Sequence, residues 1–298
     1  MSEIVLTGLD GANPLGFLAG LGVLEALTAR RAPARLAWRD VGGWRPVVSG
    51  VDADLEQLVA WLDADRIACG DEPALALAYD GKQDLKPPPD IFRAYLEEQL
   101  DGATPERRRG VDWAAGFGSD VVQDNNGNTK PTALHFTAGN QLFLKMVREL
   151  ATGVDDNDFE EALIGPWRYE RQLPVMGWDA TASRDYALRA GDPSKEKKAG
   201  VPGADWLAIR GLASVPVAPV GTRLKTTGCV GGWKSGSFRW GLWTVPLDLA
   251  MARATMRLEL VGMDASERSA RGIGAVLSCG IKRSDQGGYG SFEPAMVV

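Results

Sequence analysis

The sequence predicts an α+β protein, with a mixed α/β N-terminal half that contains a buried N-terminal helix and a β-rich C-terminal half. An N-terminal segment is apolar on all sides, and strand-like and helix-like apolar patterns then alternate up to residue 165. From residue 166 onwards Trp, Gly, Pro and β-branched residues predominate. This change predicts an acidic mixed region, 1–165, and a basic, β-rich region, 166–298, which form two domains or one continuous domain.

The N-terminal helix is predicted over residues 14–30, directly after a short strand near 3–9. Asn13 is a favourable N-cap, and Pro14 suits the first helical position, where its missing N–H costs nothing. Between residues 15 and 27, Glu25 is the one charged side chain, so the helix needs cover on several sides.

Two glycines of this helix, Gly16 and Gly20, lie one turn apart and are expected to permit a close approach of another backbone. The apolar run is too short to cross a bilayer, and no basic segment precedes it. We therefore expect neither a membrane span nor a secretion signal.

Spacing and turn residues predict the remaining elements in chain order. The first half has strands at 35–39 and 45–49, helices at 52–66, 90–100, 137–151 and 158–164, and mainly loop between 103 and 132. Asn157 and Glu160 match a capping box at the last of these helices. The second half has strands at 238–245, 273–282 and 289–296.

Composition excludes several classes of site. Cys69, Cys229 and Cys279 are far apart, which favours free thiols in a reducing cytoplasm over a disulfide framework. The single histidine, His135, removes His-based zinc sites and is predicted to be structural or on the surface. A glycine-rich stretch at 228–236 is not a phosphate loop, because Trp233 stands where glycine must precede the Lys. No catalytic residue, metal site or cofactor is predicted.

Several motifs resemble one known family. The segment NPLGFLAGLGVLE (13–25) is similar to the N-terminal pattern of CRISPR-associated proteins of the type I-U group, also called I-G. Further similar stretches are LPVMGWD (173–179), RDYAL (184–188), DPSK (192–195), GADWLAIRGL (203–212), RGIG (271–274) and GGYG (287–290). They cover about half of the chain, and none is a catalytic motif.

This resemblance implies a non-catalytic large subunit of a Cascade-type interference complex that senses the motif beside the target. The implied partners are CRISPR RNA, target DNA, other Cascade subunits and a recruited helicase-nuclease. Two alternatives stay open: a backbone or crRNA-end subunit of the same complex, and a cytosolic enzyme that holds a small anionic substrate with the basic residues of 223–239.

The net charge of −6 hides a marked asymmetry. Residues 1–165 carry 15 Lys and Arg against 27 Asp and Glu, whereas residues 166–298 carry 18 against 12. Because a polyanion responds to local potential, phosphate contacts are expected in the second half. The alternative is that the oppositely charged halves pack against each other.

The candidate nucleic-acid contacts combine cations with neighbouring aromatic residues. Strand alternation over 238–245 puts Phe238 and Trp240 on one face, which is expected to be core, and Arg239 and Trp243 on the other. A polar segment, 124–130, is either a plain surface turn or a loop whose amides contact bases. The full set of candidates is Arg223, Lys225, Lys234, Arg239, Lys282, Arg283, Asn125, Asn126 and Lys130.

Overall fold

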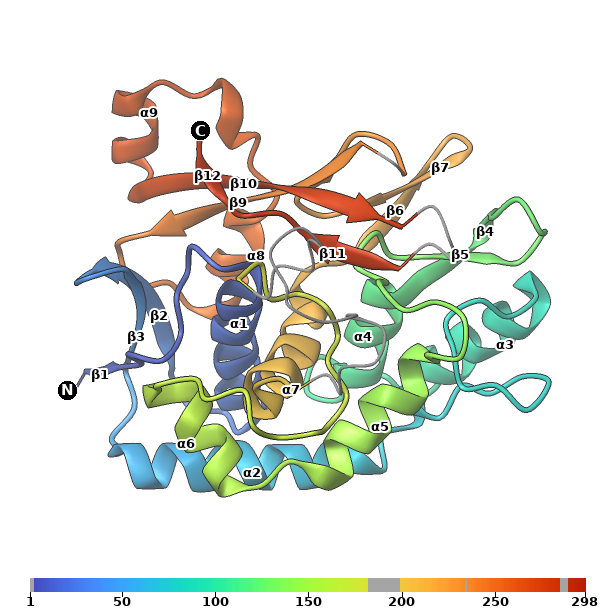
Figure 1. The fold of residues 1–298 in the computed structure, drawn as a ribbon, viewed down its shortest axis with the longest axis horizontal. Coiled ribbons are helices and arrows are strands. Elements are labelled where there is room, and N and C mark those ends of the chain that lie inside the picture. Colours follow the sequence, from blue (N-terminus) through green and yellow to red (C-terminus); the bar gives the residue numbers. More distant parts are fainter. Residues whose placement is uncertain (1–2, 182–198, 234, 285–288) are drawn as a thin grey trace, which may run out of the picture.

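The computed structural model describes residues 3–181, 199–233, 235–284 and 289–298, and its elements confirm the predicted α+β class. Two helices, α1 (Pro14–Ala29) and α7 (Pro202–Gly211), lie side by side at the centre. A sheet lies on one side of this pair and α2, α5 and α6 lie on the other (Figure 1). The fold is therefore built around a contact between distant parts of the chain.

Helix α1 has the start and the burial that the sequence predicts. The Asn13 side chain accepts a hydrogen bond from the backbone N–H of Leu15, and every residue from Pro14 to Leu27 is buried. Helix α7 is an element that the apolar patterns did not predict. It is buried along its whole length, so it shows no amphipathic stripe, and its glycines are typical of loops.

Glycines let α1 and α7 touch backbone to backbone. A Cβ atom at Gly22 would overlap the carbonyl of Leu207, and Gly211 approaches α1 equally closely from the other helix. A close approach was expected at Gly16 and Gly20. It is confirmed at Gly16, where a Cβ atom would overlap backbone atoms of Asp10, whereas Gly20 packs against the ring of Trp38. The contact with α7 is made by Gly22.

A cluster of aromatic side chains joins α1 to the strands that contain Trp38 and Phe238. The ring of Phe17 lies 5.6–6.4 Å from the rings of Trp38, Phe238, Trp240 and Trp243. The expectation that Trp243 lies on the face opposite Trp240 was wrong. The register with the neighbouring strand shifts at this point through a β-bulge, and Trp243 is fully buried in the cluster.

The sheet that covers α1 has antiparallel strands in the order β11-β10-β9-β8, and β12 also pairs with β10. Their bounds are β8 (Cys229–Val230), β9 (Gly236–Trp243), β10 (Ile273–Arg283), β11 (Gly290–Phe292) and β12 (Met296–Val297). A three-stranded sheet has the order β1-β3-β2 and consists of β1 (Ile4–Val5), β2 (Arg35–Asp40) and β3 (Trp44–Ser49). Two hairpins complete the strands: β4 (Gly118–Gln123) with β5 (Thr129–Pro131), and β6 (Val217–Val220) with β7 (Arg223–Thr226).

Four further helices lie close to their predicted positions: α2 (Leu55–Gly70), α3 (Pro89–Leu100), α5 (Phe143–Gly153) and α6 (Asp156–Ile164). The capping box of α6 is formed by Asp155 and Asp158, not by Asn157 and Glu160, because the helix begins two residues earlier than predicted. Besides α7, three helices were not predicted: α4 (Arg109–Phe117), within the expected loop, and α8 (Leu249–Thr255) and α9 (Ala265–Ala270), within the β-rich half.

Residues on both sides of the predicted boundary at 165/166 share one hydrophobic cluster. Leu18 and Leu21 of α1 belong to it together with Leu207 of α7 and Leu242 of β9. Among the described residues, no helix combines the length and the apolar character needed to cross a membrane.

Candidate nucleic-acid interface and arginine pocket

The five-stranded sheet has an apolar inner face and a polar outer face. Phe238 and Trp240 of β9 are buried against α1, whereas Arg239 between them points to the other side, as alternation predicts. Arg239 pairs with Ser278 of β10. Lys282 lies four residues further along β10, so it belongs to the same outer face, where it is exposed.

A groove of about 320 Å³ crosses this outer face beside β8 and β9, and we call it the outer-face groove. Lys225, Arg239 and Arg257 line it together with Glu259. The Nε atom of Arg239 is buried and has no hydrogen-bond partner within the described residues. The apolar part of the lining includes Val230, Met256, Leu258, Leu260, Val261 and Val276. A planar, partly apolar ligand with a negative charge fits such a lining.

Strand β7 brings two predicted cations to one side of its hairpin. Arg223 and Lys225 are two residues apart and both are exposed, and Lys225 reaches the outer-face groove. Thr226 faces the other way, where its Oγ1 accepts a hydrogen bond of 2.8 Å from the backbone N–H of Ala133. Lys234, the fourth cation predicted in this part of the sequence, lies outside the described residues.

The predicted amide loop is the tip of the β4–β5 hairpin. Oδ1 of Asp124 accepts hydrogen bonds from the backbone N–H groups of Asn126 and Asn128, at 2.8 and 3.0 Å, which fixes the turn. The side chains of Asn125 and Asn126 are exposed, and Lys130 is half-buried on β5. This hairpin packs, through β4, against β6 and β7, the hairpin that carries Arg223 and Lys225.

Arg283 is engaged inside the protein. Its guanidinium donates to the carbonyl oxygens of His135 and Ala133, at 2.8 and 2.7 Å, and lies over the rings of Phe136 and Trp233. Burial lowers the pKa of Arg283 to about 10. Of the two neighbouring cations predicted at the end of β10, Lys282 is therefore the one that the structure exposes.

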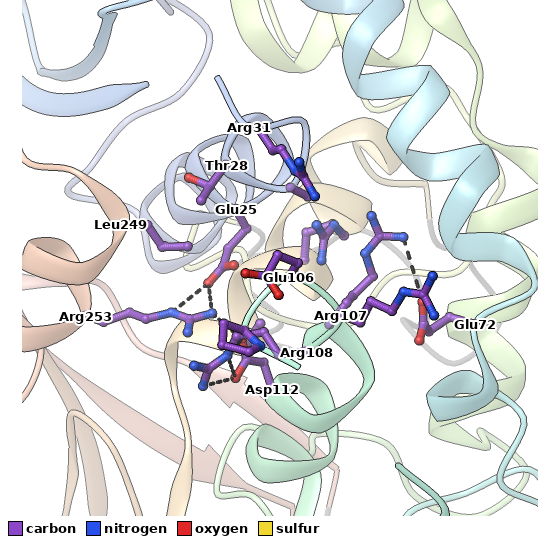
Figure 2. A pocket seen from close by; sticks show the side chains of 15 residues that line it. Glu25, Thr28, Arg31, Glu72, Glu106, Arg107, Arg108, Asp112, Leu249 and Arg253 are labelled. Atoms are coloured by element: carbon purple, nitrogen blue, oxygen red, sulfur yellow. Dashed lines mark hydrogen bonds and ion pairs between the residues drawn. The ribbon is translucent and has the colours of Figure 1, made fainter. Parts of the chain in front are cut away.

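A second cationic site was not predicted, and we call it the arginine pocket (Figure 2). It has a volume of about 550 Å³ and lies between the C-terminal end of α1, the start of α4, and α8. Its charged lining residues are Arg31, Arg107, Arg108, Arg109, Arg210, Arg253, Glu25, Glu72, Glu106 and Asp112. Apart from the run of three arginines at 107–109, they are dispersed from the first helix to the eighth, so no local spacing reveals the set.

The floor of the arginine pocket is a network of buried ion pairs. Nε of Arg210 lies 2.7 Å from Oδ2 of Asp65, and both side chains are almost completely buried. Arg253 connects Glu25 and Asp112, with 2.8 Å between its Nη2 and a carboxylate oxygen of each. These pairs hold the floor arginines in fixed positions.

Buried His135 has a structural role. Its Nε2 lies 3.1 Å from Oδ1 of Asp84 and 3.1 Å from Oγ1 of Thr137. Burial lowers the pKa of His135, although the hydrogen bond with Asp84 acts in the opposite direction. The imidazole is therefore neutral in the folded protein near pH 7.

Cysteine thiols and metal-ligating side chains bear on covalent and metal chemistry. Burial raises the pKa values of Cys69 and Cys229 to about 12, so both thiols stay protonated at neutral pH. No group of three or more His, Cys, Asp and Glu side chains within the described ranges is arranged to hold a metal ion. A scan against protein-family models and a search of curated proteins found no match to this chain.

Proposed function

We propose that the chain is a nucleic-acid-binding subunit of a type I CRISPR interference complex. The observation that carries the nucleic-acid part is the outer-face groove, where Lys225 and Arg239 from separate strands flank one apolar surface. Single-stranded nucleic acids bind where cations contact the backbone and apolar or aromatic surface contacts the bases. Arg257 adds a third cation that the sequence did not single out.

The assignment to a CRISPR complex rests on the sequence resemblance. Under this proposal the chain occupies the large-subunit position, contacts neighbouring subunits, and binds guide RNA or target DNA. A backbone or crRNA-end position is the alternative within the same complex. The electrostatic argument favours binding in the assembled complex over binding by the isolated chain, because the chain as a whole is acidic.

The groove is tested by Lys225→Ala combined with Arg239→Ala. Fluorescence anisotropy with two labelled single-stranded RNAs of unrelated sequence, over a series of salt concentrations, gives the affinity and its salt dependence. Each lost phosphate contact should reduce the magnitude of the slope of log K against log salt by about 0.7. The affinity should decrease by a similar factor for both RNAs. The matched control is Lys145→Ala with Arg148→Ala, two exposed cations on α5. Unchanged affinity and slope in the groove variant would rule out this surface.

The complex is tested by co-expressing the chain with a CRISPR array and the genes for the other subunits of a type I-G interference complex. We expect it to co-purify with the guide RNA and the other subunits, and we expect its deletion to abolish interference against a target plasmid. Full interference without the chain would contradict the assignment, whereas groove binding could still stand.

A further inference from the structure

The arginine pocket contains two arginines that its ion-pair network leaves unused. Arg108, Arg210 and Arg253 each pair with a carboxylate at 2.7–2.8 Å. Arg31 and Arg107 also line the pocket, yet neither side chain has a hydrogen bond or an ion pair within the described residues. Both are exposed at the rim, where they can turn towards a ligand without losing an existing partner.

Helix α4 adds to the positive potential of this pocket. Its start carries three consecutive arginines, Arg107, Arg108 and Arg109, and no side chain caps it. Positive side chains are unfavourable at a helix N-terminus, where the backbone dipoles already present a partial positive charge. The Nε atom of Arg109 is also buried without a hydrogen-bond partner in the described part of the chain. An anion in the pocket would offset the charge of these arginines and the positive end of the helix dipole, and it would offer a hydrogen-bond acceptor to Arg109.

The conformation of Arg31 points in the same direction. Its φ of 61° places it in the left-handed region, directly after α1, where glycine is the favoured residue. An arginine at this position strains the backbone but places a guanidinium at the pocket rim (Figure 2). Strain of this kind is typical of residues that serve a site.

The carboxylates of the pocket are already engaged and cancel only part of these charges. Glu72 lies 3.8 Å from Arg109, and Glu25 and Asp112 are bound by Arg253. Glu106 accepts a hydrogen bond from the hydroxyl of its neighbour Thr104. Six arginines and four acidic residues line the pocket, and Asp65, which pairs with Arg210 and Arg109, is a fifth carboxylate, so one positive charge is in excess.

We propose that the arginine pocket binds the phosphate group of a small phosphomonoester, with Arg31 and Arg107 closing on it from the rim. A phosphomonoester carries close to two negative charges near neutral pH, which the two rim guanidinium groups of Arg31 and Arg107 can balance. The planar guanidinium fork is suited to paired hydrogen bonds with phosphate oxygens. A volume of about 550 Å³ has room for a mononucleotide as well as for free phosphate.

Calorimetric titration of the full chain tests this proposal with three probes: inorganic phosphate, adenosine 5′-monophosphate and adenosine. We expect both phosphate-bearing probes to bind at one site and adenosine not to bind. Tighter binding of the monophosphate than of inorganic phosphate would identify a nucleotide-sized ligand, and the reverse order would identify free phosphate. Absence of heat with both phosphate-bearing probes at millimolar concentration would overturn the proposal.

The double variant Arg31→Ala and Arg107→Ala should bind the phosphate-bearing probes at least tenfold more weakly than the parent protein does. Its circular dichroism spectrum and its Tm should stay close to those of the parent protein. Arg148→Ala, which removes an exposed arginine on α5, is the matched control and should leave binding unchanged. Equal affinity in the double variant and the control would also overturn the proposal. Because these substitutions leave the outer-face groove intact, a probe that binds only in the groove would keep its affinity in the double variant.

Discussion

The arginine pocket and the outer-face groove use cations of the same C-terminal region in opposite ways. In the pocket, Arg210 and Arg253 bind carboxylates of the acidic region 1–165. In the groove, Lys225 and Arg239 have no ion pair within the described residues. The positive charge of the C-terminal region therefore has two physical roles. Part of it holds the two regions of the chain together, and part of it remains on the surface, where a ligand can use it.

The largest expected effect of this difference is on the buried side. Asp65→Ala removes the carboxylate that pairs with buried Arg210 and with Arg109. An uncompensated buried charge should lower the free energy of unfolding by about 3–5 kcal/mol. Urea denaturation measures the loss. Glu3→Ala, which breaks an exposed ion pair with Arg39, should cost no more than about 1 kcal/mol. Similar losses in the two variants would remove the contrast between buried and exposed charge.

A pH-dependent test of buried charge is available at His135, the single histidine of the chain. Burial holds the pKa of His135 below the ordinary value of 6.5. On acidification this side chain therefore binds a proton more readily in the unfolded chain than in the folded protein. Stability should therefore decrease as the pH falls below about 6.5. His135→Gln keeps a hydrogen-bonding side chain but cannot titrate, so its Tm should decline less between about pH 6.5 and pH 5. Parallel pH profiles for the two proteins would contradict this role.

A smaller effect, of opposite sign, is expected at the pocket rim. Arg31→Gly relieves the left-handed backbone and should raise the free energy of unfolding by about 0.5–1 kcal/mol, once the extra freedom of glycine in the unfolded chain is deducted. The same change should weaken phosphate binding, because a rim guanidinium is lost. Thermal denaturation and phosphate titration of one preparation measure both effects. A variant that is less stable than the parent would show that the Arg31 side chain supports the fold.

The smallest change in stability is expected in the groove. Lys225→Ala with Arg239→Ala removes cations that pair with no carboxylate in the described structure. The free energy of unfolding should therefore change by no more than about 0.5 kcal/mol. Thermal melts of the variant and of the α5 control variant should coincide. A large loss of stability would mean that these cations contribute to the fold, and a loss of RNA binding could then no longer be assigned to the groove.

The elements that the sequence predicted are those whose signals are local. Helix α1 follows from two adjacent residues, Asn13 and Pro14, and β10 follows from one apolar run with turn residues on either side. Helix α7 was missed because burial on all sides removes the amphipathic period. Helix α4 was missed because its start carries arginines in place of a capping side chain.

The same reasoning explains which parts of the candidate sites were predictable. Lys225 and Arg239 share a short cation-rich stretch, so the sequence singled them out before the groove was known. Arg257 belongs to the groove through a later loop, and nothing near it in the sequence marks it. The arginine pocket depends on Glu25 and Arg253 meeting from opposite ends of the chain, and only the fold establishes that contact. The run of three arginines at 107–109 was the one local signal available.

The pairing of α1 with α7 also affects how the chain folds during synthesis. Helix α1 is synthesised well before α7, and the helix that covers it is complete only when residue 211 has been added. Until then the glycines of α1, a helix without a polar face, are not covered by the backbone of α7. Contacts of such long sequence separation slow folding, and exposed apolar surface promotes aggregation in the meantime. A fragment that ends before α7 should therefore accumulate in an insoluble form, even though it contains every residue of the best-predicted helix.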